Sequence, residues 1–303
     1  VLFSNKFIIP LCPGGIMHNS NINNIRKTQR RNFLKYLIAT GTTSSLLACS
    51  SNTQKEERNL NNPLLWAVAW KQTAAEYGAL CYQAFNLAKL RVEMAIERND
   101  EKKPLAVITD MDDTIIHSAS YWGHLIKQGK DFFDDKVWDD WLPENLITAV
   151  PGSLDFFRYC AENSVEIFYV TNRDQGERTY EYALDQLKFL KFPNADKNHL
   201  TVYRDTSDKM PTKLSVSKKY NLVLMLGDNL NDYKRDYYVK DVDQRYKLME
   251  KDSHDYGNKF IVLPNPTDGH WVRAIFGESE PLPNDDNRSL LFSAATRVSW
   301  NRK

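Results

Sequence analysis

Five short, mainly apolar runs alternate with longer amphipathic segments from residue 105 onward in this 303-residue chain. The runs are 105–108, 166–170, 200–203, 222–226 and 260–263. Strands that are apolar throughout are typical of a parallel sheet whose two faces are both covered by helices. Three of the intervening segments have helical length and apolar spacing, namely 151–163, 176–189 and 211–220. This order predicts an α/β fold built on a doubly wound parallel sheet.

Polar side chains directly follow three of the apolar runs. The stretches are DMDDT at 110–114, TNR at 171–173 and GDNLND at 227–232. Because ligands of open α/β sheets bind at the carboxyl ends of the strands, we expect these stretches to form one site. Aspartates after strands are also frequent turn and cap residues. Two aspartate clusters and a threonine at three strand ends favour a catalytic site, and acidic oxygen ligands without thiolates favour Mg²⁺ over zinc.

Together these stretches resemble the motifs of the haloacid dehalogenase (HAD) superfamily in their chain order. More narrowly, residues 105–271 are similar to the class C acid phosphatases, the family of bacterial lipoprotein e. The similarity is carried by DMDDT, AVPG at 149–152, FYVTNR at 168–173, GDNLND and FIVLPN at 260–265. The resemblance implies a HAD-type, Rossmann-like sheet with a small, mainly helical, aromatic-rich cap. It also implies hydrolysis of small phosphomonoesters.

The same resemblance implies roles for the residues of the motifs. Asp110 would attack phosphorus and form an aspartyl-phosphate, which splits one difficult step into two. Asp112 would protonate the leaving alcohol and then take a proton from the hydrolytic water. One Mg²⁺ ion would be held by Asp110, Asp228 and the backbone carbonyl of Asp112. Asp232 and Asn172 would support the metal ligands from outside.

A threonine and a lysine complete the implied catalytic set. Thr171 would hydrogen-bond a phosphoryl oxygen, and the lysine would stabilise charge on the transferring group. Family members carry a basic residue in a short turn before the GDN strand, which is SDKMPTK at 207–213 here. Spacing to Asp228 favours Lys209 and leaves Lys213 in reserve. Most lysines, however, are solvated surface residues.

Residues 118–148 are rich in aromatic side chains and fall between the first two motifs, where the superfamily places its cap. Tyr121, Phe133 and Trp138 are the candidates for binding an aromatic leaving group, consistent with 5′-nucleotides as substrates. The alternative is that these rings form the core of a small cap, and the sequence favours neither interpretation.

Asp268 departs from the family pattern. After LPN the family tends to place a tyrosine before Gly and Trp, whereas this chain has aspartate in TDGHW at 267–271. A carboxylate in place of a stacking face would suit a cationic leaving group, such as that of nicotinamide mononucleotide (NMN).

Two other functions are compatible with parts of the sequence. A sugar phosphatase of the same superfamily would keep every catalytic residue and differ in the cap. A non-catalytic surface-binding lipoprotein would have no use for the aspartates.

The N-terminal region has the features of an export signal. Arg30 and Arg31, followed by an FLK triplet after one residue, resemble a twin-arginine signal. Residues 36–48 are too short and too polar to span a bilayer as a helix. LLAC at 46–49 resembles a bacterial lipobox, which predicts diacylation of Cys49 and tethering to a membrane. The residue after Cys49 is Ser50 and not the aspartate typical of retention in the inner membrane, so we expect the lipoprotein to reside in the outer membrane.

Three segments follow from this organisation. Residues 1–48 are the expected signal region, in which Met17 would be the true start. Residues 49–63 are a polar, lipidated tether, and 64–303 form the phosphatase domain with its cap insert at about 118–148. Helical spacing over 64–97 predicts one or two helices packed on that domain.

Charge and cysteine content exclude some alternatives. The net charge of +1 gives no electrostatic argument for a nucleic-acid polymer as partner. The four cysteines show no zinc-ligand spacing. A disulfide between Cys81 and Cys160 is compatible with the envelope, but spacing alone cannot place the two residues within bridging distance. An oligomer is equally compatible with the sequence.

Overall fold

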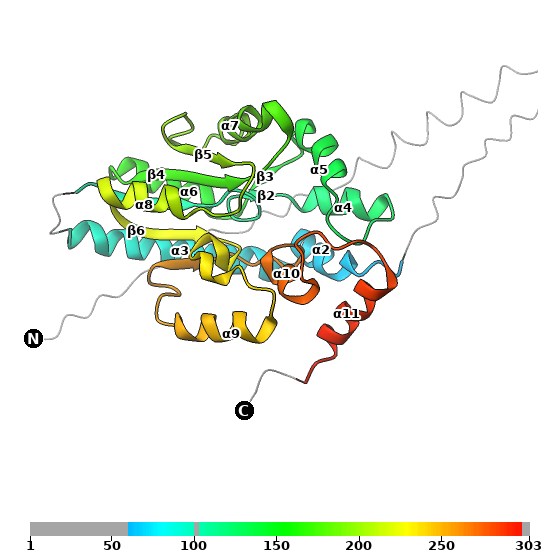
Figure 1. Ribbon diagram of the computed structural model, residues 1–303. Helices are drawn as coiled ribbons and strands as arrows, with labels where there is room; N and C mark the ends of the chain where they lie inside the picture. Colours follow the sequence, from blue (N-terminus) through cyan, green and yellow to red (C-terminus); the bar gives the residue numbers. More distant parts are fainter. Residues whose placement is uncertain (1–59, 100–102, 299–303) are drawn as a thin grey trace, which may run out of the picture. The chain divides into compact units, whose positions relative to one another are not determined.

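The computed structural model describes residues 60–99 and 103–298, and the predictions made for residues 1–59 lie outside the described residues. Within the described part, a five-stranded sheet has the order β5-β4-β1-β6-β7, and every neighbouring pair is parallel (Figure 1). The strands are β1 (Leu105–Thr109), β4 (Glu166–Asn172), β5 (Leu200–Tyr203), β6 (Asn221–Gly227) and β7 (Phe260–Val262). All five predicted strands are confirmed, and all five residues of the central strand β1 are buried.

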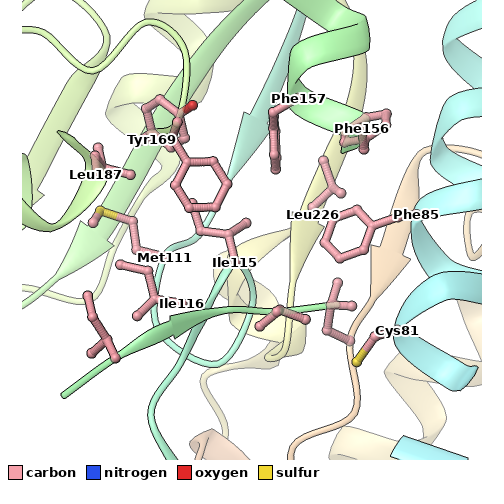
Figure 2. Packing of buried hydrophobic residues seen from close by; sticks show 14 of the residues in the cluster. Cys81, Phe85, Met111, Ile115, Ile116, Phe156, Phe157, Tyr169, Leu187 and Leu226 are labelled. Atoms are coloured by element: carbon pink, nitrogen blue, oxygen red, sulfur yellow. The ribbon is translucent and has the colours of Figure 1, made fainter. Parts of the chain in front are cut away.

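Helices cover both faces of the sheet. Those that precede β4, β5 and β6 in the chain are α6 (Ser153–Glu162), α7 (Thr179–Phe189) and α8 (Met210–Lys219). In the larger core, Phe157 of α6 and Leu187 of α7 pack near Tyr169 of β4 (Figure 2). Val216 of α8 joins a second cluster with Ile108 and other strand residues. Because alternate side chains of a strand point to opposite faces, the two clusters occupy opposite faces of the sheet. The doubly wound α/β fold is therefore confirmed.

Two helices precede the sheet, as the spacing over 64–97 predicts. They are α2 (Leu64–Thr73) and α3 (Ala75–Glu97), separated at Ala74, whose backbone is extended (φ −77°, ψ 125°). The buried side of α3 includes Cys81 and Phe85, which belong to the larger core. Cys81 and Cys160 are both buried and free, and burial raises the pKa of each thiol.

A small cap lies between the two strands of an antiparallel pair, β2 (Ile116–His117) and β3 (Thr148–Ala149). The cap contains α4 (Ala119–Lys127), α5 (Asp135–Trp141) and the 3₁₀ turn η1 (Leu142–Glu144). Its centre is aromatic: the fully buried Tyr121 contacts several other rings, with ring-centroid distances of 4.9 to 5.7 Å. The rings are those of Trp122, Phe133, Trp138 and Trp141. The mainly helical, aromatic-rich cap is thus present.

Sequence patterns did not predict the elements of the carboxyl-terminal part. These are α9 (Val242–Lys251), α10 (His270–Phe276) and α11 (Asp285–Ala295), with 3₁₀ turns η3 (Leu230–Asp232) and η4 (Arg235–Tyr237). Most residues of α11 are exposed, which explains why it carries no strong apolar periodicity. In the described residues, every helix is too short or too polar to cross a membrane.

Candidate active site

Asp110 directly follows β1, at the carboxyl ends of the parallel strands, where ligands are expected to bind. Its backbone N–H still donates to the carbonyl of Leu226 in β6 (3.0 Å), so the sheet fixes its position. The chain then turns sharply, with Asp113 in the left-handed region (φ 55°) and its N–H donating to the Ile116 carbonyl (2.8 Å). This turn brings Thr114 back beneath the carboxylate of Asp110.

Thr114 links the first and third motifs. Its hydroxyl lies 3.1 Å from Asp110 Oδ2 and 3.2 Å from Asp228 Oδ1, and it accepts the backbone N–H of Asp228 (3.0 Å). A hydroxyl has one proton, so it donates to one of the two carboxylates at a time. Thr114 is fully buried, and its position sets the separation of the two aspartates.

Lys209, directly before α8, is the lysine that reaches Asp110. Its ammonium contacts Asp110 Oδ1 and also lies 2.7 Å from Asp232 Oδ1. The other oxygen of Asp232 accepts the backbone N–H of Asn229 (3.0 Å). Burial disfavours the charged ammonium, but the two carboxylates outweigh it and raise the pKa of Lys209 above its usual range.

Lys213 lies one helical turn further along and does not reach the carboxylates. Its ammonium is 4.0 Å from the sulfur of Met210, and the side chain is buried. Burial lowers the pKa of Lys213 to about 8. Of the two lysines that the sequence left as alternatives, the structure brings Lys209 into the site.

Three carboxylates form a cluster suited to a cation. One oxygen from each of Asp110, Asp228 and Asp232 lies within 4.8 Å of the others. Burial, together with the neighbouring carboxylates, raises the pKa of Asp110 to about 7 despite the ammonium of Lys209. Burial and the carboxylates of Asp232 and Asp110 raise the pKa of Asp228 well above its usual range. A single lysine does not neutralise this charge, and a donor set made of oxygen atoms fits a hard divalent cation.

Two amides hold the carboxylate of Asp228. The side-chain nitrogen of Asn265 donates to Asp228 Oδ2 (2.7 Å), and that of Asn229 donates to the same oxygen (3.1 Å). Asn265 follows β7 in the FIVLPN stretch, whereas Asn229 follows β6 in GDNLND. Strands β6 and β7 therefore both contribute to the cluster through residues for which the sequence suggested no role.

Asp112 is held by an arginine. Arg173 forms a two-pronged ion pair, with Nε 2.6 Å from Asp112 Oδ2 and Nη2 2.5 Å from Oδ1. Its remaining nitrogen, Nη1, donates to Gln186 of α7 (2.8 Å). The Thr171 hydroxyl also lies 3.3 Å from Asp112 Oδ2. Such fork-to-carboxylate contacts fix orientation as well as charge.

Asn172 does not support the carboxylate cluster as expected. Its exposed side-chain amide faces the backbone carbonyls of Tyr203 and Thr206, at the end of β5, and the amide orientation that satisfies both places its nitrogen 3.1 Å and 2.6 Å from them. Asn172 points there because side chains alternate along a strand, and its neighbours Thr171 and Arg173 face Asp112. The structure thus assigns Asn172 to the loop after β5.

A cavity of about 820 Å³ opens above these residues. Its walls include Asp110, Asp112, Thr171, Lys209 and Asp228 from the carboxyl edge of the sheet, Phe133 and Trp138 from the cap, and Asp268 from the segment after β7. Burial raises the pKa of the Asp268 carboxyl to about 6. The structure therefore brings the predicted catalytic residues and two of the three predicted aromatic residues to one space.

Tyr121 is the aromatic residue that the structure keeps away from this cavity. It is fully buried, and its hydroxyl lies 3.1 Å from both the N–H and the carbonyl of Asp134. The ring packs edge-on against Trp138 with a centroid distance of 4.9 Å. Tyr121 therefore belongs to the core of the cap, which was the alternative interpretation.

Several site residues carried a signal that sequence reasoning did not use. Arg173 is a charged residue directly after a buried strand, and Asn265 is a polar one shortly after another. Such positions at the carboxyl edge of a parallel sheet are candidates for a site irrespective of the motif.

A parallel sheet with a buried aspartate, a lysine and further carboxylates at its carboxyl edge, beneath a helical cap, defines a phosphatase of the HAD type. Residues 33–271 match the family described as HAD superfamily, subfamily IIIB (acid phosphatase), and the chain belongs to this family. It is a phosphoric monoester hydrolase. HAD phosphatases generally use a divalent metal, in agreement with the aspartate cluster.

Two solved structures extend the comparison. The class C acid phosphatase from Bacillus anthracis is 28% identical in sequence, with a TM-score of 0.71, and the match covers 79% of this chain and 98% of that chain. A structure of the class C acid phosphatase from Bacillus anthracis with tungstate bound has the same identity and a TM-score of 0.72. That match covers 80% of this chain and 99% of the other. The predicted resemblance to this family is confirmed.

Proposed function

We propose that this chain is a Mg²⁺-dependent acid phosphatase that uses Asp110 as nucleophile and acts on 5′-nucleotides or NMN at the cell envelope. The observation that carries the proposal is the placement of Lys209. Its ammonium contacts Asp110 and Asp232 on the wall of the cavity. There it would offset the negative charge of the Asp110 carboxylate and of an incoming phosphoryl group, which otherwise repel each other. A buried lysine with a purely structural role would be expected to pair with carboxylates inside the protein core, whereas both partners of Lys209 line the cavity.

The proposed reaction has two steps. An oxygen of Asp110 forms a bond to phosphorus while the bond from phosphorus to the leaving oxygen breaks, and Asp112 donates a proton to that oxygen. Asp112 then takes a proton from a water molecule that attacks the aspartyl-phosphate, which releases phosphate and restores Asp110. A proton on Asp112 displaces one contact of the Arg173 fork, so this ion pair must be loosened before the first step and re-form after it.

The cation would be held by Asp110, Asp228 and the backbone carbonyl of Asp112. Asp232 and Asn265 would orient these ligands, since each hydrogen-bonds a group at the site. When bound, Mg²⁺ would offset the charge of the clustered carboxylates and of the phosphoryl oxygens. The crowded oxygen donors and the raised pKa values of Asp110 and Asp228 support this assignment.

The proposal is tested by phosphate release from purified protein that begins after Cys49. We expect release from AMP and NMN with Mg²⁺, and a loss of at least about 10²-fold with EDTA that added Mg²⁺ restores. Full activity in EDTA after prolonged dialysis would refute the metal requirement. No release from any phosphomonoester by folded, Mg²⁺-loaded protein would refute the function.

The same assay addresses the leaving group. Phe133 and Trp138 line the cavity and offer ring faces, and Asp268 places a carboxylate beside them. We therefore expect a higher kcat/KM for NMN than for AMP, and a lower one for a sugar phosphate. Asp268→Tyr should remove the preference for NMN without abolishing AMP hydrolysis. Equal use of NMN and AMP by both proteins would contradict the role of Asp268, and preference for the sugar phosphate would indicate a sugar phosphatase.

The location at the envelope rests on the sequence of residues outside the described part. Arg30 and Arg31, a short apolar stretch and the LLAC lipobox occur in the order that lipoprotein export requires. We expect labelled palmitate to be incorporated into the wild-type chain expressed in a Gram-negative host, and the protein to sediment with outer membranes. Cys49→Ala should lose the label and the membrane association. Membrane association that survives in the unlabelled variant would refute a lipid anchor at Cys49.

A further inference from the structure

Lys71 is a charged residue at an unusual place. It lies on α2, outside the sheet and its motifs, and it is 2% exposed. Its ammonium is 2.8 Å from Asp113 Oδ2, and that carboxylate is also buried. Removing two charges from water is costly, and a buried ion pair is weak evidence for stabilisation. The pair therefore calls for an explanation other than stability.

All three protons of this ammonium have an acceptor. Besides Asp113, they face Thr267 Oγ1 (2.9 Å) and Asn265 Oδ1 (3.2 Å) in the segment after β7. The second oxygen of Asp113 accepts the N–H (3.2 Å) and the hydroxyl (2.8 Å) of Ser118. Lys71 thus joins the loop of the first motif to the segment after β7 through one fully satisfied group.

Lys71 and Thr267 together determine which way the Asn265 amide points. Its oxygen accepts from Lys71 and from the hydroxyl (2.7 Å) and the backbone N–H (3.1 Å) of Thr267, so its nitrogen faces the Asp228 carboxylate (2.7 Å). Lys71 also donates to the Thr267 hydroxyl oxygen, which directs the hydroxyl proton toward Asn265. Without the ammonium, the amide oxygen loses its charged donor and the Thr267 hydroxyl loses the contact that directs it, so rotation of the oxygen toward the carboxylate is opposed only by Thr267. Two oxygen acceptors would then face each other, and Asp228 would lose a donor.

We propose that Lys71 is a positioning residue for the divalent cation. It fixes the Asp228 carboxylate through Asn265, and it fixes the turn that carries Asp112 through Asp113. The affinity of the site for its cation then depends on helix α2, which belongs neither to the sheet nor to the sequence motifs. This inference rests on the metal site proposed above.

The test is direct titration of Mg²⁺ by calorimetry into wild type, Lys71→Met and Lys71→Met/Asp113→Asn. The double variant leaves no unpaired buried charge, so it should fold and can be measured even if the single variant unfolds. We expect the dissociation constant for Mg²⁺ to rise by about 10- to 100-fold in both variants, the range found for residues that support metal ligands. Saturating Mg²⁺ should restore most of kcat, because the ammonium does not touch the substrate.

Lys89→Met is the matched control, since Lys89 is an exposed lysine of α3 with a surface partner, Glu93. It should bind Mg²⁺ as the wild type does. Wild-type affinity in Lys71→Met or in the double variant would overturn the inference and leave the proposed function intact. If the wild type itself bound no Mg²⁺, the proposed metal site would fail and the inference with it.

Discussion

Asp110→Asn is expected to lower the rate of phosphate release by about 10⁴-fold or more, the scale of loss seen when a nucleophile is removed. An amide in this position has the shape of the carboxylate but lacks the charge and the nucleophilic oxygen. The fold should survive, because the substitution removes one of three crowded carboxylates while the backbone contact of residue 110 with Leu226 remains. The measurement is phosphate release from AMP at saturating Mg²⁺.

Asp155→Asn serves as the control for this prediction, since Asp155 is an exposed aspartate of α6 away from the cavity. It should retain the wild-type rate, and both variants should show a cooperative thermal transition. Activity within about 10-fold of wild type in Asp110→Asn would show that the nucleophile is another group and that neither the charge nor the oxygen of Asp110 is essential to the reaction.

Lys209→Met is expected to reduce kcat by about 10²- to 10³-fold, the usual effect of removing one preorganised donor from a charged transition state. The methionine fills a similar volume but leaves Asp110 and Asp232 without their cation. Lys213→Met should stay close to the wild-type rate, since that ammonium contacts a methionine sulfur and no carboxylate. Both lysines belong to the segment at the start of α8, so the comparison isolates the contact with Asp110.

Thermal unfolding distinguishes an effect on chemistry from an effect on folding. The activity of Lys209→Met reports on chemistry only when its transition is cooperative and the variant still binds Mg²⁺. Equal losses of activity in both lysine variants, with both proteins folded, would show that the ammonium acts through the general positive potential of this segment and would remove the specific role given to Lys209.

The sheet and most of the catalytic positions follow from local patterns along the chain. Continuous apolar runs are needed for strands that are buried on both faces, so the residue pattern alone was sufficient to place β1 and β4 to β7. The residues at the ends of these strands meet because the strands are parallel, which brought Asp110, Thr171 and Asp228 to one cavity. Local pattern was sufficient here because each signal lies within a few residues of the strand that carries it.

Which side chains touch one another depends on the three-dimensional packing of the elements. The choice of Lys209 over Lys213 depends on the direction in which α8 begins, and the exclusion of Tyr121 from the cavity depends on how the cap helices pack. The hydrogen bond from Lys71 to Thr267 joins residues that are 196 positions apart in the chain. No local pattern encodes such a contact, because the burial of a charge becomes apparent only when all of its partners have been brought together by the fold.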